Sequence, residues 1–253
     1  MFDVFSSFSP TILIFLSLVL LIAGAVRGFA GFGAGMIFMP VASSLISPPI
    51  AAASFLFIDG IVALPLIWRA VRICDWSTVL PAVLGAVTFV HIGAWMLATM
   101  DVLVLRWIIF GIVASLMALL ISGWRFRSKP RRPVTFSVGA TAGILGGISQ
   151  VSAPPVAALW LSSVKEPAIV RANMIVFFAL ASIGTFIAYT LNGFFTIAVW
   201  HLLIVAIPSY AFGLYMGSKG FGTADPGVYR RVAYGLIGLA AVTSMPLLDG
   251  ILR

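Results

Sequence analysis

Two interrupted stretches of an otherwise apolar chain carry the side chains that could do chemistry. The first, GAVRGFAGFGAGMIFMPV over 24–41, places Arg27 among glycines and ends close to a proline. The second, GILGGISQVSAPPV over 143–156, places hydroxyl and amide side chains ahead of two prolines. A guanidinium presents paired N–H donors that match an oxyanion, and hydroxyl and amide groups add further donors. These residue types predict a binding site for a small anion.

We expect both stretches to contribute to that site. Glycine allows the backbone to approach a ligand closely and adopts positive φ without strain. A second arginine lies about one turn into a later apolar segment, where its guanidinium could also reach an anion. The candidate substrate-binding residues are Arg27, Gly31, Gly33, Gly35, Ser149, Gln150, Ser152 and Arg171.

Prolines close both stretches, Pro40 in the first and Pro154 and Pro155 in the second. Proline fits the first turn of a helix because its missing N–H needs no partner there. We therefore expect a short helix to begin at each position, at membrane depth. Its N-terminus would carry a partial positive charge and unpaired N–H donors, which suit an anion. The alternative is that the prolines kink continuous helices.

Titratable side chains also lie inside apolar segments, where a charge is costly and usually faces a cavity or a partner. Asp59 is a candidate for proton relay or for an ion pair with Arg27. His91 is a candidate for proton coupling because imidazole titrates near neutral pH. Other interpretations stay open: Arg171 extends to the membrane interface, His91 packs structurally, and Ser149 with its neighbours satisfies backbone groups.

The composition indicates a membrane protein. The 253 residues are 62% hydrophobic and only 9% charged, with a mean hydropathy of +1.16, whereas about a quarter of the residues in soluble domains are charged. The net charge of +8 fits basic loops beside a membrane better than nucleic-acid binding. A single cysteine, Cys74, excludes an internal disulfide, and no cofactor or metal is expected.

The hydropathy pattern predicts an all-α polytopic fold, because apolar runs of about 18 residues or more recur along the chain. Two of the segments, and a marginal third, are too short to cross ~30 Å of hydrocarbon, which indicates broken or re-entrant helices. The ten expected segments are Thr11–Phe29, Met36–Ile46, Ile50–Trp68, Ser77–Met100, Val102–Trp124, Val134–Ile148, Ala153–Val164, Ala168–Tyr189, Thr196–Met216 and Val228–Leu248.

Basic residues predict the orientation of the segments. Alternate threading brings four basic loops to one side, around 69–72, 125–132, 165 and 219–231. Cytoplasmic loops carry an excess of Lys and Arg, so we expect both termini on the outer, periplasmic side. The first segment lacks the basic residues that precede a signal peptide's apolar core, and we expect it to be retained.

The two halves of the chain align with each other. Residues 24–42 and 139–157 share seven identities at a constant offset of 115. Each half holds five segments, so the second copy would enter the membrane in the opposite orientation. The expected division is a first repeat over 1–124, a basic cytoplasmic linker over 125–133 and a second repeat over 134–253. Inverted repeats with interrupted segments are typical of secondary transporters with a midplane site.

Three stretches resemble the TauE/SafE family of anion exporters, within the 4-toluene sulfonate uptake permease-like superfamily. They are RGFAGFGAG with its following proline, GILGGISQVSAPPV, and VRANMIVFFALASIGTFIAYTLNG. The resemblance implies proton-coupled export of sulfite or an organosulfonate such as sulfoacetate across the bacterial inner membrane. The family's second motif usually ends in Gly-Gly-Pro-Pro, and this chain has Ser152-Ala153-Pro154-Pro155 instead.

Other functions stay open at this point, namely a passive anion channel or a carrier for a different small anion on the same scaffold. An intramembrane enzyme is disfavoured, because His91 and His201 lack an adjacent nucleophile, base or metal-binding motif. The expected partners are a small oxyanion, protons and the lipid bilayer, without nucleic acid. A homodimer is left open.

Overall fold

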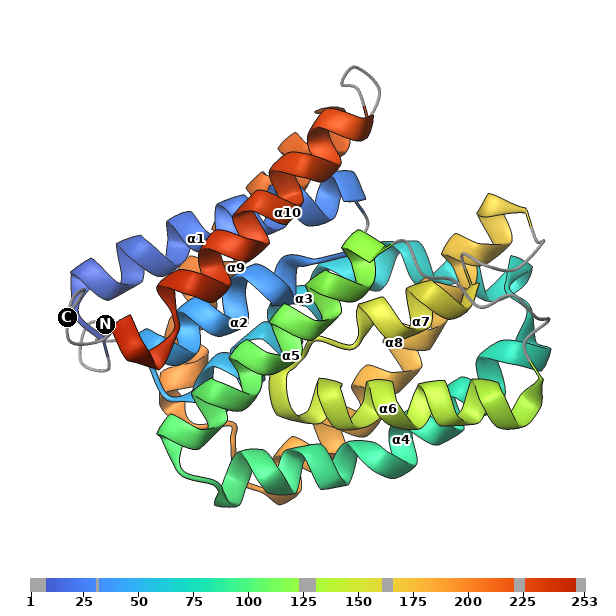
Figure 1. The fold of residues 1–253 in the computed structure, drawn as a ribbon, viewed down its shortest axis with the longest axis horizontal. Coiled ribbons are helices and arrows are strands. Elements are labelled where there is room, and N and C mark those ends of the chain that lie inside the picture. Colours follow the sequence, from blue (N-terminus) through green and yellow to red (C-terminus); the bar gives the residue numbers. More distant parts are fainter. Residues whose placement is uncertain (1–7, 31, 123–130, 161–165, 221–225, 249–253) are drawn as a thin grey trace. The chain divides into compact units, whose positions relative to one another are not determined.

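The computed structural model describes residues 8–30, 32–122, 131–160, 166–220 and 226–248, and every regular element in these ranges is a helix (Figure 1). The helices are α1 (Pro10–Ala30), α2 (Ala34–Leu45), α3 (Pro48–Ile73), α4 (Trp76–Thr99), α5 (Val102–Ser122), α6 (Arg132–Ser149), α7 (Ala153–Trp160), α8 (Pro167–Leu191), α9 (Ile197–Gly220), α10 (Pro226–Thr243) and the 3₁₀ turn η2 (Pro246–Leu248).

Each predicted apolar segment corresponds to one α-helix, and the ends that can be compared differ by a few residues. The predicted ends at Trp124 and Val164 lie outside the described residues. Five of these helices are long and apolar enough to cross a membrane: α1, α4, α5, α8 and α9. The segments predicted to be too short form α2, with 12 residues, and α7, with eight described residues. The expectation of an all-helical polytopic membrane protein is therefore confirmed.

The helices group into two compact units that do not follow the order of the chain. The first unit joins Met1–Ile58, Met100–Met117 and Phe194–Arg253, and the second joins Asp59–Thr99 and Ala118–Gly193. Each unit therefore combines helices from both halves of the sequence. The predicted division at the linker 125–133 concerns the sequence repeat and stays a prediction.

In the first unit, α1 packs against α9 with almost no space between the backbones. A Cβ added to Gly24 would overlap the carbonyl oxygen of Tyr210, and one added to Gly28 would overlap that of Leu214. Four residues further along α1, the contact lies four residues further along α9, so the two helices run parallel. Gly213 of α9 faces the backbone of α1 in the same way.

In the second unit, α4 and α6 form a matching parallel pair and lie side by side in Figure 1. A Cβ added to Gly139 would overlap the carbonyl oxygen of Ala82, and one added to Gly143 would overlap that of Ala86. Such close approach lets dispersion forces hold two helices together where water does not drive them to associate. Gly139 and Gly143 are therefore helix-packing residues.

The core of the second unit also fixes α7 and α8. Trp160 at the end of α7 and Phe177 of α8 are both buried, and their rings meet edge to face with centroids 5.7 Å apart. The indole N–H of Trp160 donates to the hydroxyl of Thr78 on α4, 3.3 Å away. The short α7 is therefore held at its C-terminal end by neighbours on two other helices.

The structure corrects the predicted role of one proline. Pro40 lies inside α2, which begins at Ala34, so it does not start that helix. The start is set by Gly33, whose φ of 99° lets the chain change direction without a proline. Pro154 and Pro155 do lie in the first turn of α7, as predicted.

Replacing Gly143 by alanine should destabilise the protein strongly, because the added methyl group meets the backbone of α4 rather than a movable side chain. Overpacking of this kind costs about 1–3 kcal/mol or more. Gly111→Ala is the matched control, since no atom lies within 4 Å of its added Cβ. Thermal unfolding in detergent should show a lower Tm for Gly143→Ala alone. Equal Tm values for both variants would contradict the close packing of α4 with α6.

Candidate functional site

The first helix interruption lies between α1 and α2. Gly33 adopts φ 99°, and its carbonyl accepts the N–H of Met36 at 3.1 Å. No side chain caps the following helix, whose first residues, Ala34 and Gly35, are buried. The first N–H groups of a helix have no partner within it. The N-terminus of α2 therefore presents backbone donors and a partial positive charge inside the protein.

Arg27 lies in the last turn of α1 and is half-buried. The interruption packs against this turn, because a Cβ added to Gly33 would lie 3.7 Å from a methyl carbon of Val26. The arginine and the start of α2 thus belong to neighbouring parts of one compact unit. Gly31, another predicted site residue, lies outside the described residues.

The second interruption lies between α6 and α7. The backbone leaves the helix at Gln150, whose φ is 55°, in the left-handed region that non-glycine residues rarely occupy. The N–H of Gln150 still donates to the carbonyl of Gly146 at 2.9 Å. The chain then passes through Ser152 and begins α7 at Ala153. The polar residues predicted for the site therefore lie at a real break in the helix.

The two serines predicted to donate at this break differ in whether their hydroxyl protons already make a hydrogen bond. Ser149 is fully buried and donates its only hydroxyl proton to the carbonyl of Leu145, 2.8 Å away. Ser152 is half-buried and makes no hydrogen bond within the described residues. Its side chain lies over Gly146, where an added Cβ would stand 3.6 Å from the Ser152 hydroxyl oxygen. Ser152 is the better placed of the two hydroxyls to donate to a ligand.

Sequence reasoning missed a tyrosine that belongs to this break. Tyr189 of α8 is fully buried, and its hydroxyl donates to the carbonyl of Gly147 at 2.9 Å. The same hydroxyl accepts from the side-chain amide of Gln150 at 3.0 Å. A tyrosine near the end of an apolar segment resembles an interfacial anchor. Only the spatial contact between α8 and the end of α6 reveals its role.

The remaining polar candidates lie elsewhere in the second unit. Arg171 is exposed on α8, while Asn173, two residues on, is buried and accepts the N–H of Asp75 at 2.7 Å. His91 is exposed on α4, and Asp59 is half-buried on α3. Arg27 belongs to the first unit, so its pairing with Asp59 stays a prediction.

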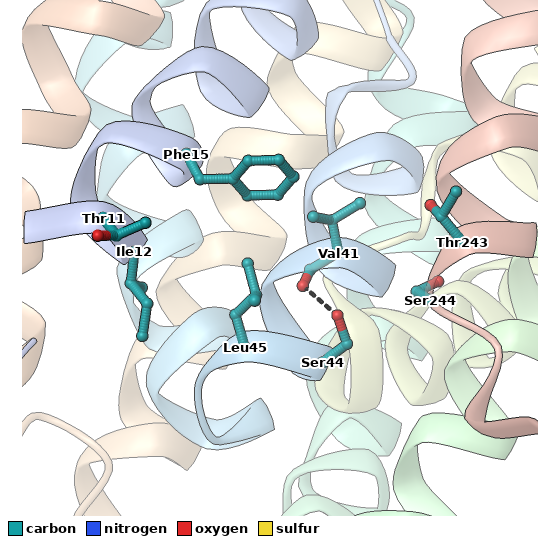
Figure 2. A pocket seen from close by; sticks show the side chains of 8 residues that line it. All are labelled: Thr11, Ile12, Phe15, Val41, Ser44, Leu45, Thr243 and Ser244. Carbon is teal, nitrogen blue, oxygen red and sulfur yellow. Dashed lines mark hydrogen bonds between the residues drawn. The ribbon is translucent and has the colours of Figure 1, made fainter. Parts of the chain in front are cut away.

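A cavity of about 360 Å³ opens in the first unit between α1, α2 and α10, and Figure 2 shows its side chains. Its lining consists of Thr11, Ile12, Phe15, Val41, Ser44, Leu45, Thr243 and Ser244. No predicted site residue is among them.

Three of the four hydroxyl side chains that line this cavity already donate to backbone carbonyls. Ser44 donates to the carbonyl of Val41 at 2.7 Å, and Thr243 and Ser244 likewise donate to carbonyls of α10. A hydroxyl has one proton, so these groups turn lone pairs rather than donors toward the cavity. Within the described residues, no group of three His, Cys, Asp or Glu side chains could hold a metal ion.

Glycine at position 150 should be better tolerated than alanine, although both remove the hydrogen bond to Tyr189. Alanine in the left-handed region costs about 1–2 kcal/mol, whereas glycine adopts it freely. We expect a higher Tm for Gln150→Gly than for Gln150→Ala in detergent. If Gln150→Ala is the more stable variant, the helix is not broken at residue 150.

Comparison with known proteins identifies the family. The model of the family described as "Sulfite exporter TauE/SafE" matches residues 16–244. A protein of Cupriavidus necator named "Probable sulfite/organosulfonate exporter TauE" is 28% identical over 238 residues, which cover 87% of this chain and 88% of that protein. No solved structure matches the chain. A polytopic helical chain that matches the family model over nearly its whole length belongs to the TauE/SafE sulfite exporter family.

Proposed function

We propose that this protein is a secondary active transporter that exports a small sulfur-containing oxyanion, sulfite or an organosulfonate such as sulfoacetate, across the inner membrane. The family match over residues 16–244 carries the proposal. The name of the Cupriavidus relative supports both substrates. Helices long enough to cross a membrane support a transporter rather than a soluble enzyme.

Each of the two helix interruptions is a candidate anion-binding site in its own unit, and the two differ in the groups they offer. The start of α2 supplies backbone N–H donors, and the guanidinium of Arg27 would add a full positive charge. The start of α7 offers fewer backbone donors, because Pro154 and Pro155 have no N–H. The second interruption would therefore contribute the hydroxyl of Ser152 and the amide of Gln150.

Two inverted repeats would provide alternating access for the bound anion. Under the sequence alignment, α1 corresponds to α6 and α9 corresponds to α4. The first helix of each half packs against the fourth helix of the other half: α1 contacts α9, and α6 contacts α4. Their parallel directions support alternate threading, because an even number of crossings separates the two helices of each pair. We place both termini outside, as the basic loops indicate.

Proton coupling belongs to the same proposal. Asp59 and His91 are its candidate residues, because both lie inside helices and a carboxylate or imidazole can exchange a proton during a transport cycle. A passive channel on the same scaffold would need neither residue for conduction.

Replacing Arg27 by alanine should lower the rate of sulfite flux roughly 10- to 100-fold, because a charge-assisted hydrogen bond contributes about 1.5–3 kcal/mol. The measurement is anaerobic uptake into proteoliposomes with and without an imposed pH gradient. Arg231→Ala is the matched control, since Arg231 is exposed on α10. Unchanged flux in folded Arg27→Ala protein would show that the arginine is structural.

Purified protein should be stabilised selectively by its substrate, since a ligand that binds only the folded state raises Tm. We expect sulfite or sulfoacetate to raise the Tm above the value in equal concentrations of sulfate, with thiosulfate and isethionate as further test anions. A uniform effect of all five anions would contradict a specific sulfur-anion site. Saturable counterflow would distinguish the carrier from a channel.

A further inference from the structure

The end of α6 has lost a backbone hydrogen bond that a continuous helix would contain. In an uninterrupted α-helix the carbonyl of Gly147 would accept the N–H of residue 151, four positions later. The chain turns away at Gln150, and this carbonyl instead accepts the phenolic hydroxyl of Tyr189 at 2.9 Å. A side chain of α8 therefore occupies the place of the missing backbone donor.

The direction of this hydrogen bond determines how Gln150 is oriented. The single proton of the Tyr189 hydroxyl is given to Gly147, so its oxygen can only accept from a neighbour. The group of Gln150 that faces it, 3.0 Å away, must therefore be the NH₂ and not the carbonyl oxygen. This leaves the second amide proton of Gln150 available for an anion, in a direction set by Tyr189.

Because Tyr189 is buried, water cannot easily take its place as the donor to Gly147. Tyr189 has no exposed surface, so water does not reach its hydroxyl from the surface of the protein. A buried carbonyl that loses its donor without replacement destabilises the broken conformation, and the continuous helix would regain a donor for Gly147. The tyrosine thus favours the interrupted state of α6 and α7 over the straight one.

We propose that Tyr189 is a positioning residue of the anion site: it caps the end of α6 and orients the amide of Gln150 toward the bound anion. The inference about the anion rests on the proposed function, whereas the capping of α6 does not. Tyr189 acts through Gln150 and need not touch the anion itself.

The transport test compares Tyr189→Phe with the wild type in proteoliposomes. Phenylalanine keeps the ring and removes only the hydroxyl. We expect the KM for sulfite to rise about fivefold or more while Vmax, corrected for folded protein, changes less than twofold. Tyr210→Phe is the matched control, because Tyr210 is equally buried but lies on α9, and its KM should stay at the wild-type value. An unchanged KM in Tyr189→Phe would overturn the positioning role.

A second test needs no substrate. Tyr189→Phe, Gln150→Ala and the double variant are compared by Tm in detergent. Because the two side chains share one hydrogen bond, the loss in the double variant should be clearly smaller than the sum of the single losses. Additive losses would overturn the network. A wild type that moves neither sulfite nor sulfoacetate would overturn the proposed function and the anion role. The coupling measured by Tm would still decide whether Tyr189 and Gln150 act together.

A charge variant tests the direction of the hydrogen bond. Gln150→Glu has nearly the same shape but presents only acceptors when ionised, so Tyr189 would have to withdraw its proton from Gly147. We expect Gln150→Glu to lower Tm more than Gln150→Ala does. When both changes are made in Tyr189→Phe protein, most of this difference in Tm should disappear. A Gln150→Glu variant as stable as the wild type would contradict the assigned orientation of the amide.

Discussion

A helix interrupted inside a membrane must find partners within the protein for the backbone groups that it frees, because lipid offers none. Partners of this kind are present at the α1–α2 and α6–α7 interruptions. At the first, Gly33 turns the chain and accepts the N–H of Met36. At the second, Gln150 takes a left-handed conformation and Tyr189 supplies the donor for Gly147. The first break leaves buried donors at the start of α2, whereas the second satisfies an acceptor at the end of α6.

The breaks hold their positions because the helices that carry them are fixed by backbone contact. Glycines of α1 lie against α9, and glycines of α6 lie against α4. Each contact leaves no room for a Cβ, so neither helix can rotate or slide without losing its packing. The short α2 and α7 continue directly from these fixed helices. The same close packing gives each compact unit a rigid pair of helices beside a short, interrupted one.

Much of the fold could be predicted from the sequence, since the hydropathy pattern reflects the membrane directly. The prediction that Pro40 begins a helix was wrong, because proline is compatible with a helix start but does not require one. The positive φ of Gly33, which sets the start, cannot be read from the sequence. The role of Tyr189 depends on a contact across 42 positions with Gly147. The hydrogen bond from the Ser149 hydroxyl to the carbonyl of Leu145 was likewise visible only in the structure, because a serine beside a break can donate in several directions.

The central claim is that an oxyanion binds where the helices are interrupted. The most direct measurement is an experimental structure of the protein with selenite, the heavier analogue of sulfite, whose selenium gives an anomalous X-ray signal. The account predicts a selenium peak within hydrogen-bonding distance of the start of α2, Ser152 or Gln150. A peak in the cavity lined by Phe15 and Ser244, with none at either interruption, would contradict it.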